Sequence, residues 1–330
     1  MHDDQLKFLF VALMVAMAFW GRGDRNDLEK TALQENIKTT SLAAQVQPVF
    51  IHTKSFLLKP SSIGQSGSLV DAPIKETVPY RKDWNIADPE LKVKAAAVRD
   101  LDYGSDFYSS NADVRWPLAS LTKLMSAVIA TEDIGLEKRV VISESAIAAE
   151  GISGNLEVGE QYSAGDLVKA MLVVSSNDAA TAVGEFYGLD NFVKKMRDKA
   201  VELRMDQTVF ADPTGISYLN QGSIEDLEKL VKYIDKNHPE IFKITTNQKV
   251  DLRELTKGIS KELLNINGFA SSRPDFIGGK TGFTNEANGN LISLFNYQGH
   301  RILIIVLGTD DRFGQTDILY NWVKEEYEFN

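Results

Sequence analysis

Hydrophobic residues in the middle of the chain recur with the period of a helix. After Pro117 they are spaced i, i+3, i+4, i+7 and i+8, which places them on one face of a helix and predicts that this face is buried. These residues are Leu121, Leu124, Met125, Val128 and Ile129. The same period predicts further helices, several of them preceded by Ser or Asp as N-caps, at 164–174, 178–187, 190–203 and 223–236.

Strand patterns lie on both sides of this helical block. KVKAAAVRD from Lys92 and DFYSS from Asp106 predict an opening hairpin. After Lys249, the segments KVDLREL, FIGGKTGFT, GNLISLFNY and RILIIVLG predict strands separated by Asn-Gly or Gln-Gly turns, and DILYNWVKEEYEF predicts a closing helix. This order favours an α/β (α+β) domain in which an antiparallel sheet is flanked by helices and the first strands join the late ones.

Two segments precede this pattern. Within residues 1–20, FLFVALMVAMAFW is an apolar run of about 20 Å as a helix, shorter than the roughly 30 Å hydrocarbon core of a membrane. Its length favours a signal peptide, with Ala16-Met17-Ala18 as the candidate cleavage site, or a short membrane anchor. Residues 21–84 show no sustained period and predict a flexible linker, so the folded domain is expected over 85–330.

Composition narrows the function. The chain has 46 acidic and 36 basic side chains and a net charge of -10, which argues against a nucleic-acid surface and favours a small-molecule or peptide substrate. It has no cysteine, which excludes disulfides, thiolate zinc sites and a cysteine nucleophile. Its four histidines form no zinc-binding pair, so we expect no metal and no cofactor, and the sequence argues against a metallopeptidase.

The first candidate for chemistry is Ser120-Leu121-Thr122-Lys123 at the start of the helix after Pro117. Residues i and i+3 of a helix are neighbours, so the Lys123 amine can reach the Ser120 hydroxyl. A lysine can take the proton of a serine nucleophile only when burial or a nearby cation lowers its pKa. Taken alone, this spacing is common in ordinary helices, where the lysine is simply solvated.

Two further groups of polar residues lie at a break between helices and in a strand. Ser175-Ser176-Asn177 separates two predicted helices; its side chains could relay a proton and hold a substrate amide, although alone the segment is typical of an N-cap. Lys280-Thr281-Gly282 lies in FIGGKTGFT, where an edge strand would offer a cation and a hydroxyl to a carboxylate. A phosphate-binding loop is rejected, because Pro274 occupies the position of its required glycine.

In this order, SLTK, SSN and KTG resemble the SxxK, SDN and KTG signature set of penicillin-binding serine enzymes. The chain resembles the low-molecular-mass D-alanyl-D-alanine carboxypeptidase family over residues 91–328. The resemblance is carried by AAAVRD, WPLASLTKLMSA, LEVGEQYSAGDLVKAMLVVSSNDAA, FADPTGIS, GGKTGFT and RILIIVLG. It implies a β-lactamase/transpeptidase-like fold with a mainly helical subdomain beside the sheet.

The resemblance also implies a serine D-Ala-D-Ala carboxypeptidase that acts on peptidoglycan stem peptides outside the cytoplasm and is acylated by β-lactams. Ser120 would be the nucleophile and Lys123 its base, with Ser175 and Asn177 guiding proton return. A second cation, Lys280, would help to keep Lys123 unprotonated. The residues expected to bind substrate are Lys280, Thr281, Gly282, Phe283 and Arg312; the backbone N–H groups of Ser120 and Phe283 would receive the oxyanion.

Several alternatives stay open beside this reading. An endopeptidase that cuts D-alanyl cross-links would use the same residues, and a sensor domain would be acylated by β-lactams without turnover. A class A β-lactamase would need a Glu on the loop between the second and third motifs, where this chain has FADPTGIS. The second motif of the family usually reads Ser-Gly-Asn, so Ser176 is a departure that bears on leaving-group handling. Many relatives also continue into a second domain and a C-terminal membrane helix, so any tether of this chain is expected at its N-terminus.

Overall fold

The computed structural model describes residues 78–151 and 154–329. The predicted leader, residues 1–20, and nearly all of the predicted linker lie outside the described residues. Before residue 85, where the domain is predicted to begin, Tyr80–Arg81 forms strand β1 and pairs with β13 (Tyr327–Glu328) near the other end of the chain. Among the described residues, no helix has both the length and the apolar character needed to cross a membrane.

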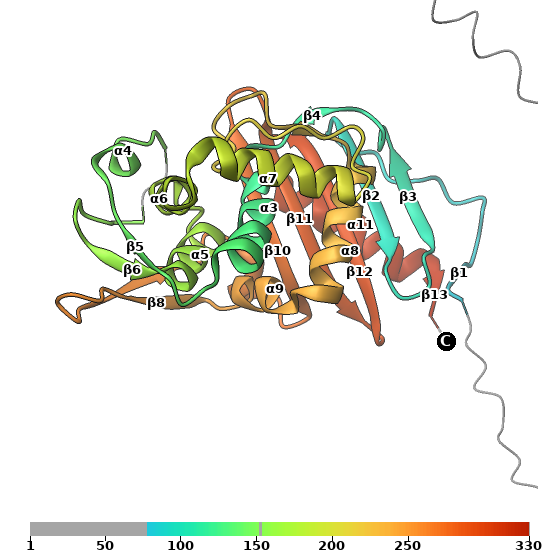
Figure 1. Cartoon of the computed structure of the whole chain (residues 1–330). Coiled ribbons are helices and arrows are strands. Elements are labelled where there is room, and N and C mark those ends of the chain that lie inside the picture. Colours follow the sequence, from blue (N-terminus) through green and yellow to red (C-terminus); the bar gives the residue numbers. More distant parts are fainter. Residues whose placement is uncertain (1–77, 152–153, 330) are drawn as a thin grey trace, which may run out of the picture. The chain divides into compact units, whose positions relative to one another are not determined.

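A five-stranded antiparallel sheet forms the centre of the domain (Figure 1). Its strands, in spatial order, are β10 (Phe276–Thr284), β11 (Asn288–Tyr297), β12 (His300–Thr309), β2 (Ala95–Asp100) and β3 (Asp106–Ser110). The predicted joining of early and late strands is confirmed: β12 pairs with β2, with Ile304 opposite Val98. The strand β10, which carries Lys280-Thr281-Gly282, is an edge strand of this sheet.

The sheet is buried on both faces, and the period of two in its strands assigns side chains to each face. In β12, Leu303, Ile305 and Leu307 pack into the core shared with the helical subdomain. The alternate residues Ile302, Ile304 and Val306 pack into a second core under the last helix, α11 (Arg312–Glu326). A run of apolar residues without alternation is therefore the expected sequence for this strand.

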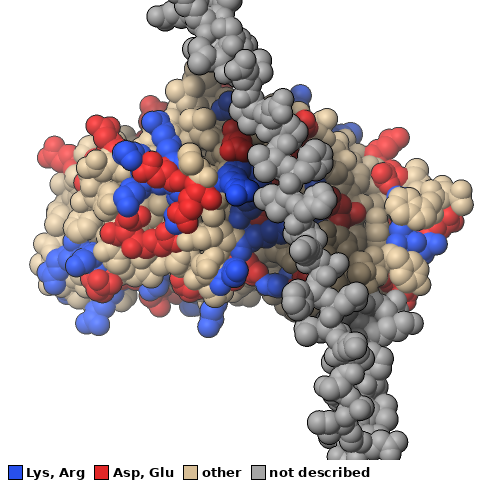
Figure 2. Space-filling model, turned by 45° about the vertical axis from the view of Figure 1, so that its right-hand side comes forward, with Lys and Arg blue, Asp and Glu red and all other residues tan. Residues whose placement is uncertain are grey.

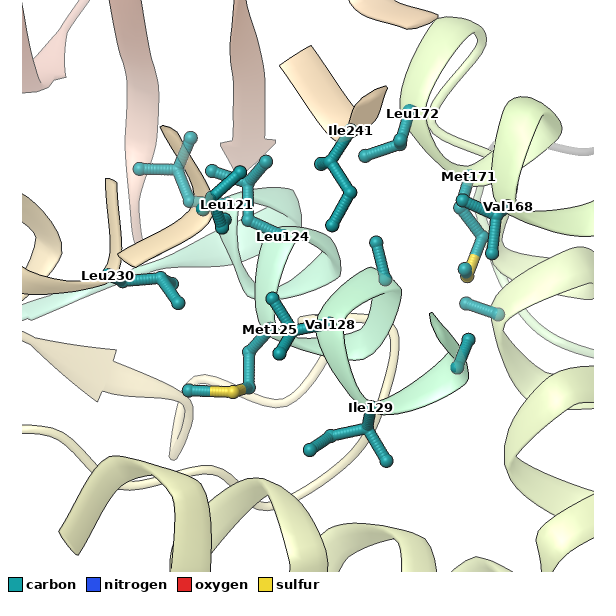
Figure 3. Packing of buried hydrophobic residues seen from close by; sticks show 14 of the residues in the cluster. Leu121, Leu124, Met125, Val128, Ile129, Val168, Met171, Leu172, Leu230 and Ile241 are labelled. Atoms are coloured by element: carbon teal, nitrogen blue, oxygen red, sulfur yellow. The ribbon is translucent and has the colours of Figure 1, made fainter. Parts of the chain in front are cut away.

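The helical subdomain is built around α3 (Thr122–Ile129). Every residue of α3 is buried, because helices surround it rather than cover one face. Figure 3 shows Leu124, Met125 and Ile129 pointing in different directions among side chains of the neighbouring helices. The larger surrounding helices are α5 (Ala164–Val173), α6 (Asn177–Tyr187), α7 (Leu189–Glu202), α8 (Ile224–Asn237) and α9 (Pro239–Thr245).

An aromatic layer fills the space between the sheet and α11. We use this name for Phe269, Phe276, Phe295 and Tyr320, which belong to the second core. The rings of Phe295 and Tyr320 are stacked, with centroids 4.3 Å apart, and the Tyr320 hydroxyl donates to Asp275 at 2.8 Å. Stacked, buried rings of this kind contribute both buried area and a preferred geometry to stability.

Three predictions about the late elements need correction. The helix α11 begins at Arg312 rather than Asp317, because the Asp311 side chain caps it by accepting from the Gly314 N–H at 2.9 Å. The residues from Lys249 form β8 (Lys249–Arg253), which pairs outside the main sheet with β9 (Ser260–Leu264). Asn288-Gly289 begins β11 instead of making the turn before it. Gln298-Gly299 does form the predicted turn, with both φ angles positive.

The remaining elements are short. They are β4 (Trp116–Pro117) with β7 (Gln221–Gly222), β5 (Arg139–Val141) with β6 (Gln161–Ser163), the single turns η1 (Ala119–Leu121), α4 (Glu144–Ile147) and α10 (Phe269–Ser272), and the π-helical turn η2 (Ala130–Ile134). On the face that Figure 2 displays, basic side chains lie among acidic ones. Ion pairs such as Lys249 with Glu262, 2.7 Å apart, are consistent with this mixture.

Candidate active site

Ser120 and Lys123 lie together where η1 leads into α3. The Lys123 Nζ atom is 3.0 Å from the Ser120 Oγ atom, the proximity that the i, i+3 spacing predicts. Ala119, which directly precedes Ser120, has a left-handed backbone conformation with φ 49°. A non-glycine residue in that region is uncommon and marks a backbone held by its surroundings.

The Lys123 amine is fully buried and has three oxygen neighbours. Besides Ser120 Oγ, these are Asn177 Oδ1 and the Thr214 carbonyl, each 2.6 Å from Nζ. An amide oxygen and a carbonyl oxygen can only accept, so they take the two hydrogens of a neutral amine. The lone pair is then left for the Ser120 hydroxyl, which is the arrangement that a general base needs.

Burial also makes the neutral amine accessible near neutral pH. It lowers the pKa of Lys123 to about 7, against the opposing influence of the Asp212 and Asp178 carboxylates. The predicted influence of Lys280 is not among the causes of this shift, in which burial is the largest. The pKa of Lys280 is itself held well below its usual value, by burial first and then by the charges of Lys123 and Arg312.

The second motif forms the break between α5 and α6. Ser175 has φ 61°, and Ser176 caps α6 by accepting from the Ala179 N–H, so the N-cap interpretation of this segment is also correct. Asn177 links two parts of the site, because its Oδ1 accepts from Lys123 and its Nδ2 donates to the Glu150 carbonyl at 2.6 Å. The caps and helices around this break thus hold its side chains in place.

The third motif lies along β10 and meets both of the others. Lys280 is buried, and its Nζ atom donates to Ser175 Oγ and to the Thr281 carbonyl, each at 2.8 Å. Gly282 lets β10 approach η1, because a Cβ atom there would lie 3.0 Å from the Leu118 carbonyl oxygen. This strand has no helix after it, unlike a phosphate-binding loop.

Phe283 and Arg312 lie at the rim. The Phe283 side chain is 59% exposed beside Gly282. Arg312 reaches across from the first turn of α11, and its Nη1 donates to the Gly282 carbonyl at 2.8 Å. The guanidinium therefore stands at the end of the KTG segment, although it lies 30 residues further along the chain.

These residues line or underlie one cleft with a volume of about 540 Å³. Its lining includes Ser120, Ser175, Asn177, Thr281, Gly282, Phe283 and Arg312, with the amines of Lys123 and Lys280 buried beneath. The structure therefore brings together all nine residues that sequence analysis selected. The described part of the chain holds no cluster of three His, Asp or Glu side chains suited to a metal ion.

The sequence motifs leave out several residues of this cleft. The lining also contains Glu150, Gly151, Gly215, Ile216, Ile266, Thr284, Asn285 and Glu286. The most important omission is Thr214, because its contribution is a backbone carbonyl and no side-chain pattern reveals it. The only signal was the Asp-Pro-Thr-Gly run, which is typical of a tight turn.

Comparisons with known proteins agree with this geometry. A family model described as D-alanyl-D-alanine carboxypeptidase, Peptidase S11, matches residues 83–311. The D-alanyl-D-alanine carboxypeptidase DacF of Bacillus subtilis is 30% identical over 250 residues, which cover 72% of this chain but only 63% of that relative. A D-alanyl-D-alanine endopeptidase of Pseudomonas aeruginosa is 31% identical, with coverage of 68% and 73%. The crystal structure of a D-alanyl-D-alanine carboxypeptidase from Mycobacterium tuberculosis superposes with a TM-score of 0.67 at 26% identity, covering 73% of this chain and 94% of that one.

Proposed function

The chain belongs to the D-alanyl-D-alanine carboxypeptidase family Peptidase S11, and from this premise we propose that it removes the terminal D-alanine from peptidoglycan stem peptides through a Ser120 acyl-enzyme. The observation that carries the proposal is the contact between Ser120 Oγ and a buried Lys123 amine at the floor of the cleft. A serine hydroxyl beside an amine with a pKa of about 7 is an activated nucleophile.

In the first step, the Ser120 oxygen attacks the carbonyl carbon between the two terminal D-alanines while Lys123 accepts the hydroxyl proton. The backbone N–H groups of Ser120 and Phe283 would stabilise the oxyanion. The C–N bond then breaks, and the departing amine takes up the proton that Lys123 accepted. Ser175 is suited to relay that proton, because its side chain lines the cleft and its hydroxyl is hydrogen-bonded to the Lys280 amine.

In the second step, a water molecule attacks the acyl-enzyme and releases the shortened peptide, which regenerates the Ser120 hydroxyl and the neutral amine. Asn177 holds Lys123 through Oδ1 throughout both steps. The free carboxylate of the substrate would lie against Thr281, Lys280 and Arg312. The Arg312 guanidinium lines the cleft itself, so it can give that carboxylate a fixed positive charge.

An endopeptidase is the second candidate. It is favoured by the Pseudomonas relative, which is named an endopeptidase and of which this chain covers 73%. Both activities cut a D-alanyl bond with the same nucleophile, so they differ in what the cleft accepts beyond that bond. A non-turnover sensor and a class A β-lactamase are not favoured, because the relatives described above are named as peptidases.

Peptidoglycan lies outside the cytoplasmic membrane, so we propose an extracytoplasmic location for this domain. Attachment through residues 1–20 remains a prediction, because that segment is outside the described residues. β-Lactams are proposed to acylate Ser120, since their strained amide mimics the D-alanyl bond.

The test uses purified muropeptides and mass spectrometry. Monomeric pentapeptides should lose one D-alanine. Cross-linked dimers, supplied intact as a second substrate, test the endopeptidase alternative by their cleavage. In parallel, fluorescent penicillin should label the wild type but not Ser120→Ala. Labelling of that variant would refute the nucleophile, and unchanged pentapeptides with efficient labelling would refute the carboxypeptidase.

The carboxylate assignment has its own control. With Arg312→Gln, KM for a peptide ending in free D-Ala-D-Ala should rise about tenfold or more, because one charged hydrogen-bond partner is lost. The same peptide with an amidated C-terminus should be affected much less. Equal losses on both peptides would contradict a carboxylate contact at Arg312.

A further inference from the structure

The turn that follows Phe210 is organised by one carboxylate, that of Asp212. Its Oδ1 accepts from the Thr214 N–H at 2.7 Å, the Thr214 hydroxyl at 2.6 Å and the Gly215 N–H at 2.7 Å. Its Oδ2 accepts from the Ser217 N–H at 3.0 Å and from Asn220 Nδ2 at 2.6 Å. Five donors therefore converge on one side chain, and they outweigh burial, so that the pKa of Asp212 is lowered and the group stays ionised.

This turn shapes the pocket of the Lys123 amine on two sides. The Thr214 carbonyl accepts from Lys123 Nζ at 2.6 Å, and the Pro213 carbonyl accepts from Ser126 Oγ, one turn along α3, at 2.7 Å. Gly215, with φ +85°, packs against Ala119: a Cβ atom there would lie 1.9 Å from the Ala119 carbonyl oxygen. The residues on both sides of the Ser120–Lys123 pair thus rest on the turn that Asp212 holds.

Several charged groups surround the Lys123 amine. Two carboxylates, Asp212 from the turn and Asp178 from α6, favour its protonated form, and Asp212 has the larger influence. Lys280 is buried on β10, and burial, followed by the charges of Lys123 and Arg312, lowers the pKa of Lys280. Asp178 is also committed to the loop after α4, since both of its oxygens accept from the Gly154 N–H at 2.9 Å.

We propose that Asp212 is a positioning residue for catalysis, which fixes the Thr214 carbonyl against Lys123 and, through its charge, keeps that amine basic enough to take the Ser120 proton. Without such a charge, a fully buried lysine becomes a weak base as well as a neutral one. This inference rests on the proposed role of Lys123 as the general base. A carboxylate outside the three sequence motifs would thus control both the position and the basicity of the Lys123 amine.

The experiment compares pH profiles of acylation by fluorescent penicillin, measured as second-order rate constants from pH 5 to 9. Asp212→Asn removes the charge, and loss of a nearby opposite charge lowers the pKa of a lysine, so the acidic limb should move to lower pH by about one unit. The rate on the plateau should fall severalfold, because the base is weaker. Asp212→Ser is a second variant without the charge, since a serine hydroxyl can maintain a related turn.

The matched control is Thr214→Val. It removes one hydrogen bond to Asp212 Oδ1 but leaves the carboxylate and the Thr214 carbonyl in the chain. This control should lower the rate at every pH without moving the acidic limb. Circular dichroism establishes that each variant is folded before its profile is compared.

An unchanged limb in both Asp212→Asn and Asp212→Ser overturns the inference, as does an equal displacement in Thr214→Val. Failure of the Ser120–Lys123 acylation step, on which this inference rests, looks different, because wild-type protein would then show no Ser120-dependent labelling at any pH. The two hypotheses are therefore separated by the wild-type profile alone.

Discussion

The aromatic layer under α11 and the floor of the cleft are both buried, yet they are built in opposite ways. The aromatic layer joins apolar rings such as Phe295 and Tyr320 from elements with regular backbone. The floor of the cleft consists of Lys123, Ser175, Asn177 and Lys280, and Ser175 has a left-handed backbone. The first region lowers the free energy of the fold by removing apolar surface from water. The second region offsets part of that stability, because burying an amine costs free energy.

This difference teaches where each kind of substitution should act. Changes at the floor of the cleft should remove activity with little loss of folding free energy, and changes in the aromatic layer should do the reverse. Functional sites commonly violate the rules of local stability, because a group that is comfortable in its surroundings is seldom reactive. Four measurements would break or sharpen the contrast.

The largest effect is expected for Lys123→Ala. Acylation by fluorescent penicillin should slow by about 10⁴-fold, which is the scale seen when one member of a nucleophile and base unit is lost. The melting temperature should stay within a few degrees of the wild type, because the variant also removes a buried amine. A melting temperature that falls as far as that of the aromatic variant below would remove the contrast.

Phe295→Ala should have the next largest effect, and on stability instead. Truncation of a buried phenylalanine costs about 3–5 kcal/mol in unfolding free energy, and a domain of this size should then melt roughly 10 °C lower. Denaturant unfolding followed by circular dichroism measures the loss. The acylation rate constant of the folded protein at low temperature should remain within about twofold of the wild type.

A change of pH tests the floor of the cleft through Lys123. Because the pKa of Lys123 is about 7, only about 1% of the amine is neutral at pH 5, so acylation should be roughly 100-fold slower there than at pH 8. The depressed pKa also means that the unfolded chain holds one more proton above pH 7. The contribution of Lys123 to the free energy of unfolding should therefore increase as pH rises from about 7 towards 10.5. A pH-independent acylation rate would contradict Lys123 as the base.

The smallest effect is expected for Tyr320→Phe. It keeps the ring stack with Phe295 but removes the hydroxyl that donates to Asp275 at 2.8 Å. The loss should be about 1 kcal/mol, the usual net value of one hydrogen bond. Tyr297→Phe is the matched control, because its hydroxyl contacts only the exposed Gln298 side chain among the hydrogen bonds described. Acylation should be unchanged in both.

The same contrast explains what the sequence could predict. The sheet and α3 follow from hydrophobic period alone, because burial imposes that period on the residues. The Ser120–Lys123 contact follows from helix geometry. The meeting of Ser175 with Lys280, 105 residues apart, depends on how helices pack against β10, and only the family resemblance anticipated it.

Other features left little signal in the sequence. The left-handed conformations of Ala119 and Ser175 occur in residues that rarely adopt them, so local propensity predicts against them. The Thr214 carbonyl is chemically identical to every other carbonyl in the chain, and its role comes from position. The strand β1 has only two residues, and its partner lies at the far end of the chain, so no periodic pattern could mark it.

That short pairing of β1 with β13 has a topological consequence. Tyr80 is the register partner of Glu328, and Tyr327 is anchored to β3, at the sheet edge opposite β10, through its hydroxyl bond to the Phe107 carbonyl. The described part of the chain from Tyr80 to Glu328 is thus almost a closed ring whose seam lies on the side away from the catalytic edge. A linker of a few residues could join the seam, and new ends could be opened at the Gln298-Gly299 turn. Such a circular permutant would keep all three motifs in their original order.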